Sequence, residues 1–172
     1  MSTANSAIRS IRVTGTGSLM GADQLGLLAA RKLAAGDLRE RYPGVHIDID
    51  TCLSPSLLPT RPAPGQALIL LDAYFGEDPP ACVRRVTAAA LETVQRPAST
   101  HGFDLPQALA VLQALHDDRL PVAIIGICAG SAPDAADLQA PGKLLETALP
   151  ALLGMLGQII GEWASVPAAH TS

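Results

Sequence analysis

Aromatic side chains and basic charge are both scarce in this sequence of 172 residues. Phe, Trp and Tyr make up only 3% of it, too little for the base-stacking platform of a single-strand nucleic-acid binder. The 12 Lys and Arg residues are scattered and outnumbered by 16 Asp and Glu, which gives a net charge of −4. We therefore expect no nucleic-acid partner.

Cysteine is sparse, and uninterrupted apolar runs of membrane-spanning length are missing. Cys52, Cys82 and Cys128 are widely spaced and form no C-x-x-C pair, which argues against a structural zinc knuckle. The simplest interpretation is that all three are small buried apolar residues in a reducing compartment. The apolar stretch after Leu144 is broken by charged residues and a proline, short of the roughly 20 clean residues of a membrane span. With a polar N-terminal segment of no signal-peptide type, we expect a cytoplasmic protein without a membrane partner.

Apolar content and strand signals are abundant. Hydrophobic residues make up 48% of the sequence, and its length suits one domain, residues 1–172, with a core at about 8–164. Residues 8–14 predict a first strand, and residues 45–50 alternate as in a half-exposed strand near a sheet edge. Residues 67–71 and 121–127 are unbroken apolar runs, typical of parallel strands buried on both faces. A short strand is also predicted at 83–86.

Helical periodicity lies between these strands. Residues 22–41 carry apolar side chains at helical spacing and end at Tyr42-Pro43-Gly44. A second helix is predicted after a capping pattern at Asp104, and a third over about 142–163. Strands that alternate with helices predict an α/β domain with a mostly parallel sheet.

Candidate site residues follow from the rule that such sheets bind ligands beyond the carboxyl ends of their strands. Asp72 directly follows the apolar run 67–71, although a cap or loop carboxylate is an equal alternative. Asp23 begins a predicted helix, where the helix dipole alone favours an acid. His101 lies in a loop ahead of a helix, as a ligand, a base or simply an exposed residue. Two carboxylates and an imidazole would suit a divalent transition metal with open coordination positions.

The glycine pair Gly15 and Gly17 after the first strand suggests a dinucleotide site, but Met20 stands where a third glycine is needed. The sequence has neither a phosphate loop ending in Lys-Ser or Lys-Thr nor a G-x-S-x-G nucleophile elbow. A nucleotide-binding domain or a small-molecule hydrolase is therefore the weakest alternative.

Three segments carry motifs in a recognisable order. Residues 15–26 are GTGSLMGADQLG, residues 68–73 are LILLDA, and residues 101–109 are HGFDLPQAL. They resemble the motifs G-x-G-N-x-L-x-x-D-[ED]-G-[VI]-G, D-A after an apolar strand, and H-x-x-x-L-x-x-x-L of the hydrogenase maturation proteases. The first match requires one residue fewer after Ser18. The similarity extends over residues 11–163, nearly the whole chain.

The resemblance implies a three-layer α/β/α fold with a twisted, mostly parallel sheet. It implies that Asp23, Asp72 and His101 bind a metal. That metal is nickel carried by the substrate, the large-subunit precursor of a nickel-iron hydrogenase, and another divalent metal can occupy the site in vitro. The implied activity is a metal-dependent endopeptidase that removes the precursor's C-terminal extension after nickel insertion. The alternative is a non-catalytic chaperone of hydrogenase assembly, related to this family.

The first motif departs from the family pattern in three ways. Ser18 replaces the usual Asn, Ala22 replaces the acid before Asp23, and the turn is shorter by one residue. A gapless alignment would instead put Gln24 at the ligand position, where a neutral amide is a poorer metal donor. We prefer Asp23, because the single gap restores residues 19–21 and Gly26 together.

Overall fold

The computed structural model describes residues 8–58, 66–87, 105–115, 120–131 and 140–164. They form a five-stranded sheet in the order β2-β1-β3-β5-β4. The strands are β1 Ser10–Thr16, β2 His46–Cys52, β3 Gln66–Phe75, β4 Val83–Val86 and β5 Val122–Gly130. All neighbours pair in parallel except β4, which is antiparallel to β5. The predicted α/β domain with a mostly parallel sheet is confirmed.

The apolar patterns predicted the places of the strands in the sheet. β3 and β5, which contain the unbroken apolar runs, are interior strands, and the alternating β2 is an edge strand. The prediction that a strand ends at residue 71 was wrong, because β3 continues to Phe75. Its ladder with β5 goes on beyond Leu71, pairing Asp72 with Gly126 and later residues with the rest of β5. Asp72 therefore lies within a strand.

The helices differ from the prediction at one place. They are η1 Gly21–Gln24, α1 Leu25–Ala35, α2 Leu38–Arg41, η2 Pro55–Leu57, α4 Leu105–Leu115 and α5 Pro141–Ala164. The single helix predicted over 22–41 is thus three pieces. Gly36, whose backbone is extended (φ −92°, ψ −167°), ends α1 and separates it from α2. The predicted cap Asp104 lies outside the described residues.

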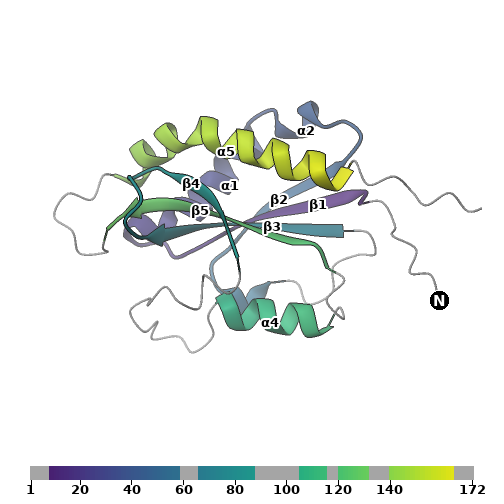
Figure 1. Cartoon of the computed structure of the whole chain (residues 1–172), viewed down its shortest axis with the longest axis horizontal. Helices are drawn as coiled ribbons and strands as arrows, with labels where there is room; N and C mark the ends of the chain where they lie inside the picture. The colour runs from purple at the N-terminus through teal and green to yellow at the C-terminus, as the bar shows by residue number, and fades with distance from the viewer. Residues whose placement is uncertain (1–7, 59–65, 88–104, 116–119, 132–139, 165–172) are drawn as a thin grey trace, which may run out of the picture.

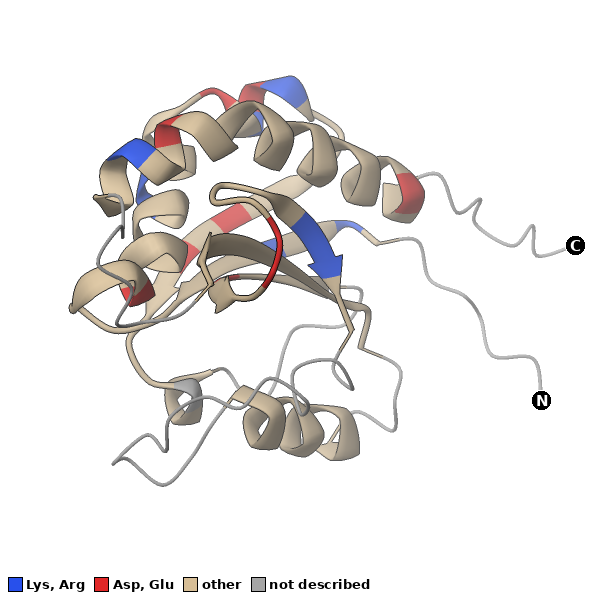
Figure 2. Cartoon of the chain, turned by 60° about the vertical axis from the view of Figure 1, so that its left-hand side comes forward, with Lys and Arg blue, Asp and Glu red and all other residues tan. Residues whose placement is uncertain are grey.

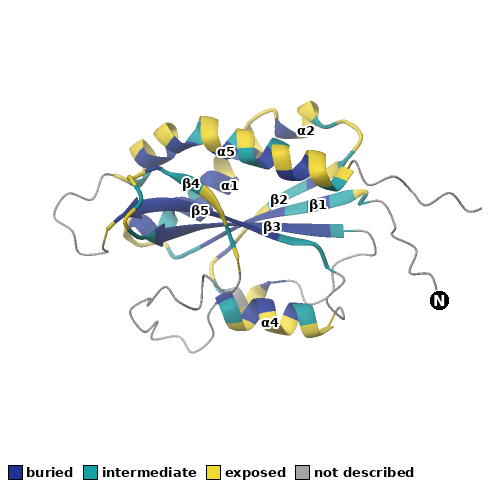
Figure 3. Ribbon diagram, viewed as in Figure 1, coloured by how far each residue is buried: buried dark blue, intermediate teal, exposed yellow. Residues whose placement is uncertain are grey.

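Helices cover both faces of the sheet, as the three-layer prediction required (Figure 1). α1 and α5 pack on one face, against a core that includes Ile69 and Leu71 of β3. α4 packs on the other, against Leu68 and Leu70 of the same strand. Side chains alternate between faces along a strand, so β3 contributes to both cores and is dark along its length in Figure 3.

Helix α5 is long and apolar enough to cross a membrane by length and composition. Its fully buried residues, however, recur at helical spacing and belong to the core on the sheet (Leu144, Leu145, Ala148, Leu152, Leu156, Ile159 and Ile160). The rest of the helix is half-buried or exposed in Figure 3. This one-sided burial is that of a helix packed on a sheet.

Candidate metal site at the carboxyl end of the sheet

The strand order creates a topological switch point between β1 and β3. From β1 the chain passes through α1 to the edge strand β2, on one face of the sheet. From β3 it runs the other way, past β5 to the opposite edge strand β4, and then through α4 back to β5. Such a reversal of direction between neighbouring strands is where these sheets usually hold their ligand crevice, at the carboxyl ends of the strands.

Asp72 belongs to β3 at this switch point. Its alternation places it on the same side of the strand as Leu68 and Leu70, toward the α4 layer. The residue is only 3% exposed, and its Oδ1 accepts a hydrogen bond of 2.9 Å from the backbone N–H of Ala73. Burying a carboxylate is costly unless it is bonded to a donor or a metal. A carboxylate kept at such a position is consistent with a binding role.

Asp23 lies in η1, directly after the turn that follows β1. The backbone of this turn is tightly packed, because a Cβ on Gly17 would lie 1.9 Å from the carbonyl oxygen of Asp23. Gly17 also has a φ of +144°, which side-chain-bearing residues rarely adopt. Within the described part of the chain, the half-buried Asp23 carboxylate makes no hydrogen bond or ion pair. Its oxygens are available to a cation.

Close backbone contacts hold the two aspartates at the same end of the sheet. A Cβ on Gly26, at the start of α1, would lie 2.2 Å from the carbonyl oxygen of Thr16 and 2.4 Å from that of Leu71. α1 therefore begins directly against the ends of β1 and the middle of β3. Since η1 precedes Gly26 and Asp72 follows Leu71, both predicted ligands border this contact.

The third predicted ligand, His101, lies outside the described residues, so its role stays a prediction. It precedes α4 in the sequence, and α4 packs on the face toward which Asp72 points. Among the described residues, no three His, Cys, Asp or Glu side chains are grouped so as to hold a metal ion. Of the three predicted ligands, Asp23 and Asp72 lie in described segments.

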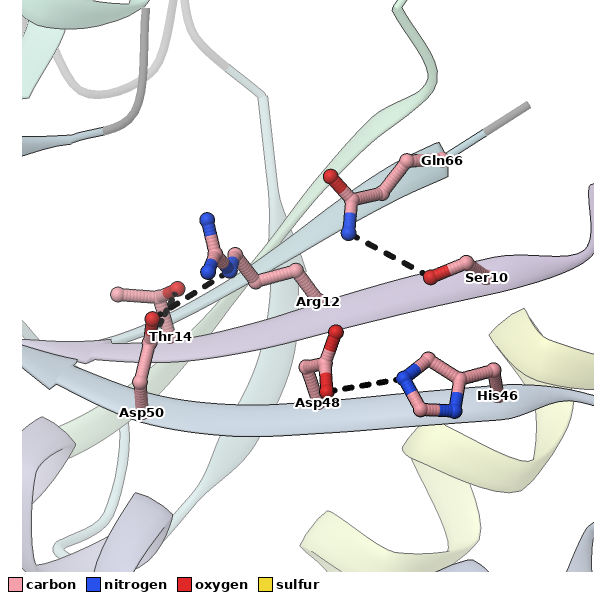
Figure 4. Close-up of polar contacts among 7 residues, drawn as sticks. All are labelled: Ser10, Arg12, Thr14, His46, Asp48, Asp50 and Gln66. Atoms are coloured by element: carbon pink, nitrogen blue, oxygen red, sulfur yellow. Dashed lines mark hydrogen bonds and ion pairs between the residues drawn. The ribbon is translucent and has the colours of Figure 1, made fainter. Parts of the chain in front are cut away.

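His46 belongs to a different polar region, as its alternating strand predicted. It contacts Asp48 at 3.1 Å on the face of β1 and β2 opposite α1 (Figure 4). On the same face of these two strands, the Thr14 hydroxyl donates a hydrogen bond of 2.6 Å to Asp50 Oδ1. The Arg12 Nε atom lies 3.4 Å from the other carboxylate oxygen of Asp50. These side chains pair with one another along the two strands, so they form no part of the candidate site.

Tyr74 is a neighbour of the site that sequence reasoning missed. Its hydroxyl donates to Asp78 Oδ2 at 2.7 Å, and its ring covers Gly126, where a Cβ would lie 2.7 Å from Cδ1. Gly126 is the residue that pairs with Asp72. Burial, then the hydrogen bond to Asp78, raise the pKa of Tyr74 well above its usual range. The signal available in the sequence was an aromatic residue two positions after Asp72, on the same face of the strand.

Large apolar side chains are exposed in the loops that begin at this end of the sheet. Leu19 and Met20 follow β1, and Leu53 and Leu57 follow β2. Met20 is 78% exposed and Leu57 72%. The two loops start side by side, because Thr16 and Cys52 are register partners at the ends of β1 and β2. Clustered exposed apolar residues are typical of surfaces that contact another protein.

Comparisons with known proteins give matches of structure. No family model matches the chain, and no curated protein matches it. A [NiFe] hydrogenase maturation protease, HycI of Thermococcus kodakarensis, superimposes with a TM-score of 0.56 at 19% identity, covering 91% of this chain and 94% of its own. The endopeptidase HycI of Escherichia coli gives a TM-score of 0.53 at 20% identity, with 94% and 99% covered.

A third solved structure is the hydrogenase maturating endopeptidase HybD of E. coli. Its TM-score is 0.52 at 20% identity, and the alignment covers 87% of this chain and 93% of HybD. At such identities the likeness is one of fold, and it extends over nearly the whole of each chain. The chain therefore has the fold of the hydrogenase maturation proteases.

Proposed function

We propose that this chain is an endopeptidase that removes the C-terminal extension of a nickel-iron hydrogenase large-subunit precursor after nickel insertion. The observation that carries the proposal is the buried Asp72, held within the central strand at the switch point of this fold. A buried carboxylate at the carboxyl ends of the strands can serve as an oxygen donor to a metal ion. The fold that this chain shares with known hydrogenase maturation proteases also supports the proposal.

Nickel enters the proposal as part of the substrate. Asp23 and Asp72 would supply oxygen donors and negative charge, and His101 an imidazole nitrogen, a set suited to a divalent transition metal. Three protein ligands leave coordination positions for the groups that hold the nickel in the precursor. The protein would thereby distinguish a precursor that has received its metal from one that has not.

The exposed apolar loops favour a protein substrate over a small molecule. Met20 and Leu57 are among the large apolar side chains exposed beside the crevice. Contact with a folded precursor would cover this surface and bring the metal-bearing region to Asp23 and Asp72. A precursor assembled in the cytoplasm would meet the protease there.

The test is incubation of the purified protein with nickel-loaded large-subunit precursor, followed by mass measurement of the precursor. We expect the mass to fall by that of the C-terminal extension, and the nickel-free precursor to remain uncut. Equal trimming of both forms would refute nickel recognition. Stable binding of the nickel-loaded precursor without trimming would refute the protease and support an assembly chaperone with the same docking surface.

A further inference from the structure

The connection from β3 to β4 is a tight turn that leads into a bulge. The backbone N–H of Cys82 bonds the carbonyl of Pro79 at 3.0 Å, and Ala81 between them has a φ of +69°. A positive φ at the third position of such a turn normally requires glycine. Ala81 then donates to the carbonyl of Cys128, and the N–H of Cys128 donates to Cys82, each at 2.8 Å. Ala81 and Cys82, directly before β4, thus both oppose Cys128 of β5, as in a β-bulge.

This arrangement puts Cys82 opposite Cys128, continuing the antiparallel register in which Val83 pairs with Ile127. The side chains of that Val–Ile pair contribute to the core on the α1 and α5 side. Since side chains alternate, the two cysteines project to the opposite face together. Directly opposed residues of antiparallel strands have Cα atoms about 4.5–5.5 Å apart. A disulfide spans about 4.4–6.8 Å between Cα atoms.

The surroundings of the two thiols differ in access to solvent. Cys128 is fully buried, and its thiol lies 3.2 Å from the carbonyl oxygen of Asp78. Cys82 is only half-buried, at the start of the edge strand β4. Both sulfurs are close enough to the Tyr74 hydroxyl to contribute to its raised pKa. One thiol is therefore reachable from solvent, and its neighbour is held beside it.

We propose that Cys82 and Cys128 form a redox-sensitive pair that a peroxide converts reversibly to a disulfide. The Cys82 sulfur attacks the peroxide O–O bond, becomes a sulfenic acid and releases water, or an alcohol from an organic peroxide. The Cys128 thiol then attacks that sulfur, forming the S–S bond and releasing a second water. Each thiol loses one hydrogen, and the peroxide takes up the two electrons. A dithiol reductant reverses the reaction.

The bond would fasten the edge strand β4 to β5 beside the candidate site. Figure 2 shows β4 as a basic strand next to the acidic segment that leads into it, and the Arg84 guanidinium lies 3.1 Å from Asp78 Oδ2. Arg84 also stacks on the Tyr74 ring, 5.0 Å from its centroid. Because that ring covers the β5 residue paired with Asp72, oxidation would act on the wall of the crevice. The proposal does not depend on the proposed protease activity.

The test treats the full chain with hydrogen peroxide, blocks the remaining thiols, and measures its mass. We expect one blocking group per chain, against three for the reduced protein, and apart from that group a mass lower by about 2 Da, the mass of two hydrogens. Dithiothreitol added before the blocking step should restore all three reactive thiols. Arg84 and Arg85 separate the two cysteines, so a tryptic peptide containing Cys128 should be joined to the peptide containing Cys82. The latter peptide also contains Cys52, because the Arg61–Pro62 bond resists trypsin. Cys52→Ser resolves which of the two is linked.

Cys52→Ser is also the matched control, since Cys52 lies on β2 at the opposite edge of the sheet. It should leave the intramolecular link intact, whereas Cys82→Ser and Cys128→Ser should each abolish it. Peptide mapping of Cys52→Ser tests the link with both Cys82 and Cys128 in place, so the result does not depend on a variant of the pair itself. Oxygen addition without a link, a link to Cys52, or a disulfide only between two chains would overturn the proposal.

Discussion

The hydroxyl of Thr16 donates a hydrogen bond of 3.2 Å to the carbonyl oxygen of Leu71, joining the end of β1 to β3 immediately before Asp72. Both residues are buried, and the same carbonyl lies against the start of α1 at Gly26. The contact ties three elements together at the switch point. It determines how the turn that carries Asp23 sits relative to the strand that carries Asp72.

Thr16→Val should lower the free energy of unfolding by about 0.5–1.5 kcal/mol, the usual net value of one hydrogen bond. Valine keeps the shape of the side chain and removes only the donor. Urea denaturation measures the change. Thr147→Val is the control, because its exposed hydroxyl bonds Lys143 within α5, and its loss should cost less. An equal effect of the two substitutions would contradict a structural role for the Thr16 bond.

Gly26→Ala should destabilise the fold by about 1–3 kcal/mol or more, because the added methyl group would overlap two backbone oxygens that cannot move independently. Gly154→Ala is the matched control in α5, where a Cβ meets nothing within 4 Å. Its helical backbone should gain about 0.5–1 kcal/mol. Thermal unfolding of both variants tests the difference, and a Gly26→Ala protein as stable as the unaltered one would contradict the close packing.

Asp72→Asn should slow processing of the nickel-loaded precursor at least about 10–100-fold while leaving the fold intact, since it keeps the size of the side chain and removes the charge. Asp23→Asn and His101→Ala should act in the same direction. Asp48→Asn is the control, because this carboxylate lies on the edge strand β2 and pairs with His46. Precursor mass and circular dichroism give the two readouts. Processing at the normal rate by the Asp72 variant would refute metal recognition.

Asp23 and Gln24 can be distinguished by the same assay. If the alignment with one gap is right, Asp23→Asn abolishes processing and Gln24→Ala leaves it nearly unchanged, because only the carboxylate contributes charge to the metal. The opposite pattern would favour the gapless alignment. Both residues are half-buried in or beside η1, so the substitutions test similar surroundings.

Tyr74 should make the fold sensitive to alkaline pH. Its pKa in the folded chain is raised by burial and by Asp78, so the folded state retains a proton that the unfolded state loses above about pH 10. Stability is then unaffected below that pH and falls as the pH rises further. Tyr74→Phe should remove the part of this alkaline loss of stability that comes from the tyrosine hydroxyl. Tyr42→Phe leaves Tyr74 as the sole tyrosine, so phenolate absorbance should appear only on unfolding.

The sequence alone determined which strands lie in the interior of the sheet and which strand lies at its edge. Unbroken apolar runs such as residues 67–71 have no polar face to turn to water, so they predict interior strands. The strict alternation of residues 45–50 predicts the edge position of β2 for the converse reason. Asp72 was identifiable as a candidate because it directly follows such a run. Burying its charge there costs free energy unless the carboxylate binds a hydrogen-bond donor or a metal.

Only the tertiary structure decided the features that depend on pairing between distant segments. β3 continues past Asp72 because β5 offers hydrogen-bond partners there, and no local pattern encodes that ladder. The predicted helix 22–41 breaks at Gly36, although its apolar spacing suits one continuous helix. The cysteines Cys82 and Cys128 face each other because a bulge sets the register of two strands. Propensity acts over a few residues, whereas the register is set by hydrogen bonds between segments far apart in the chain.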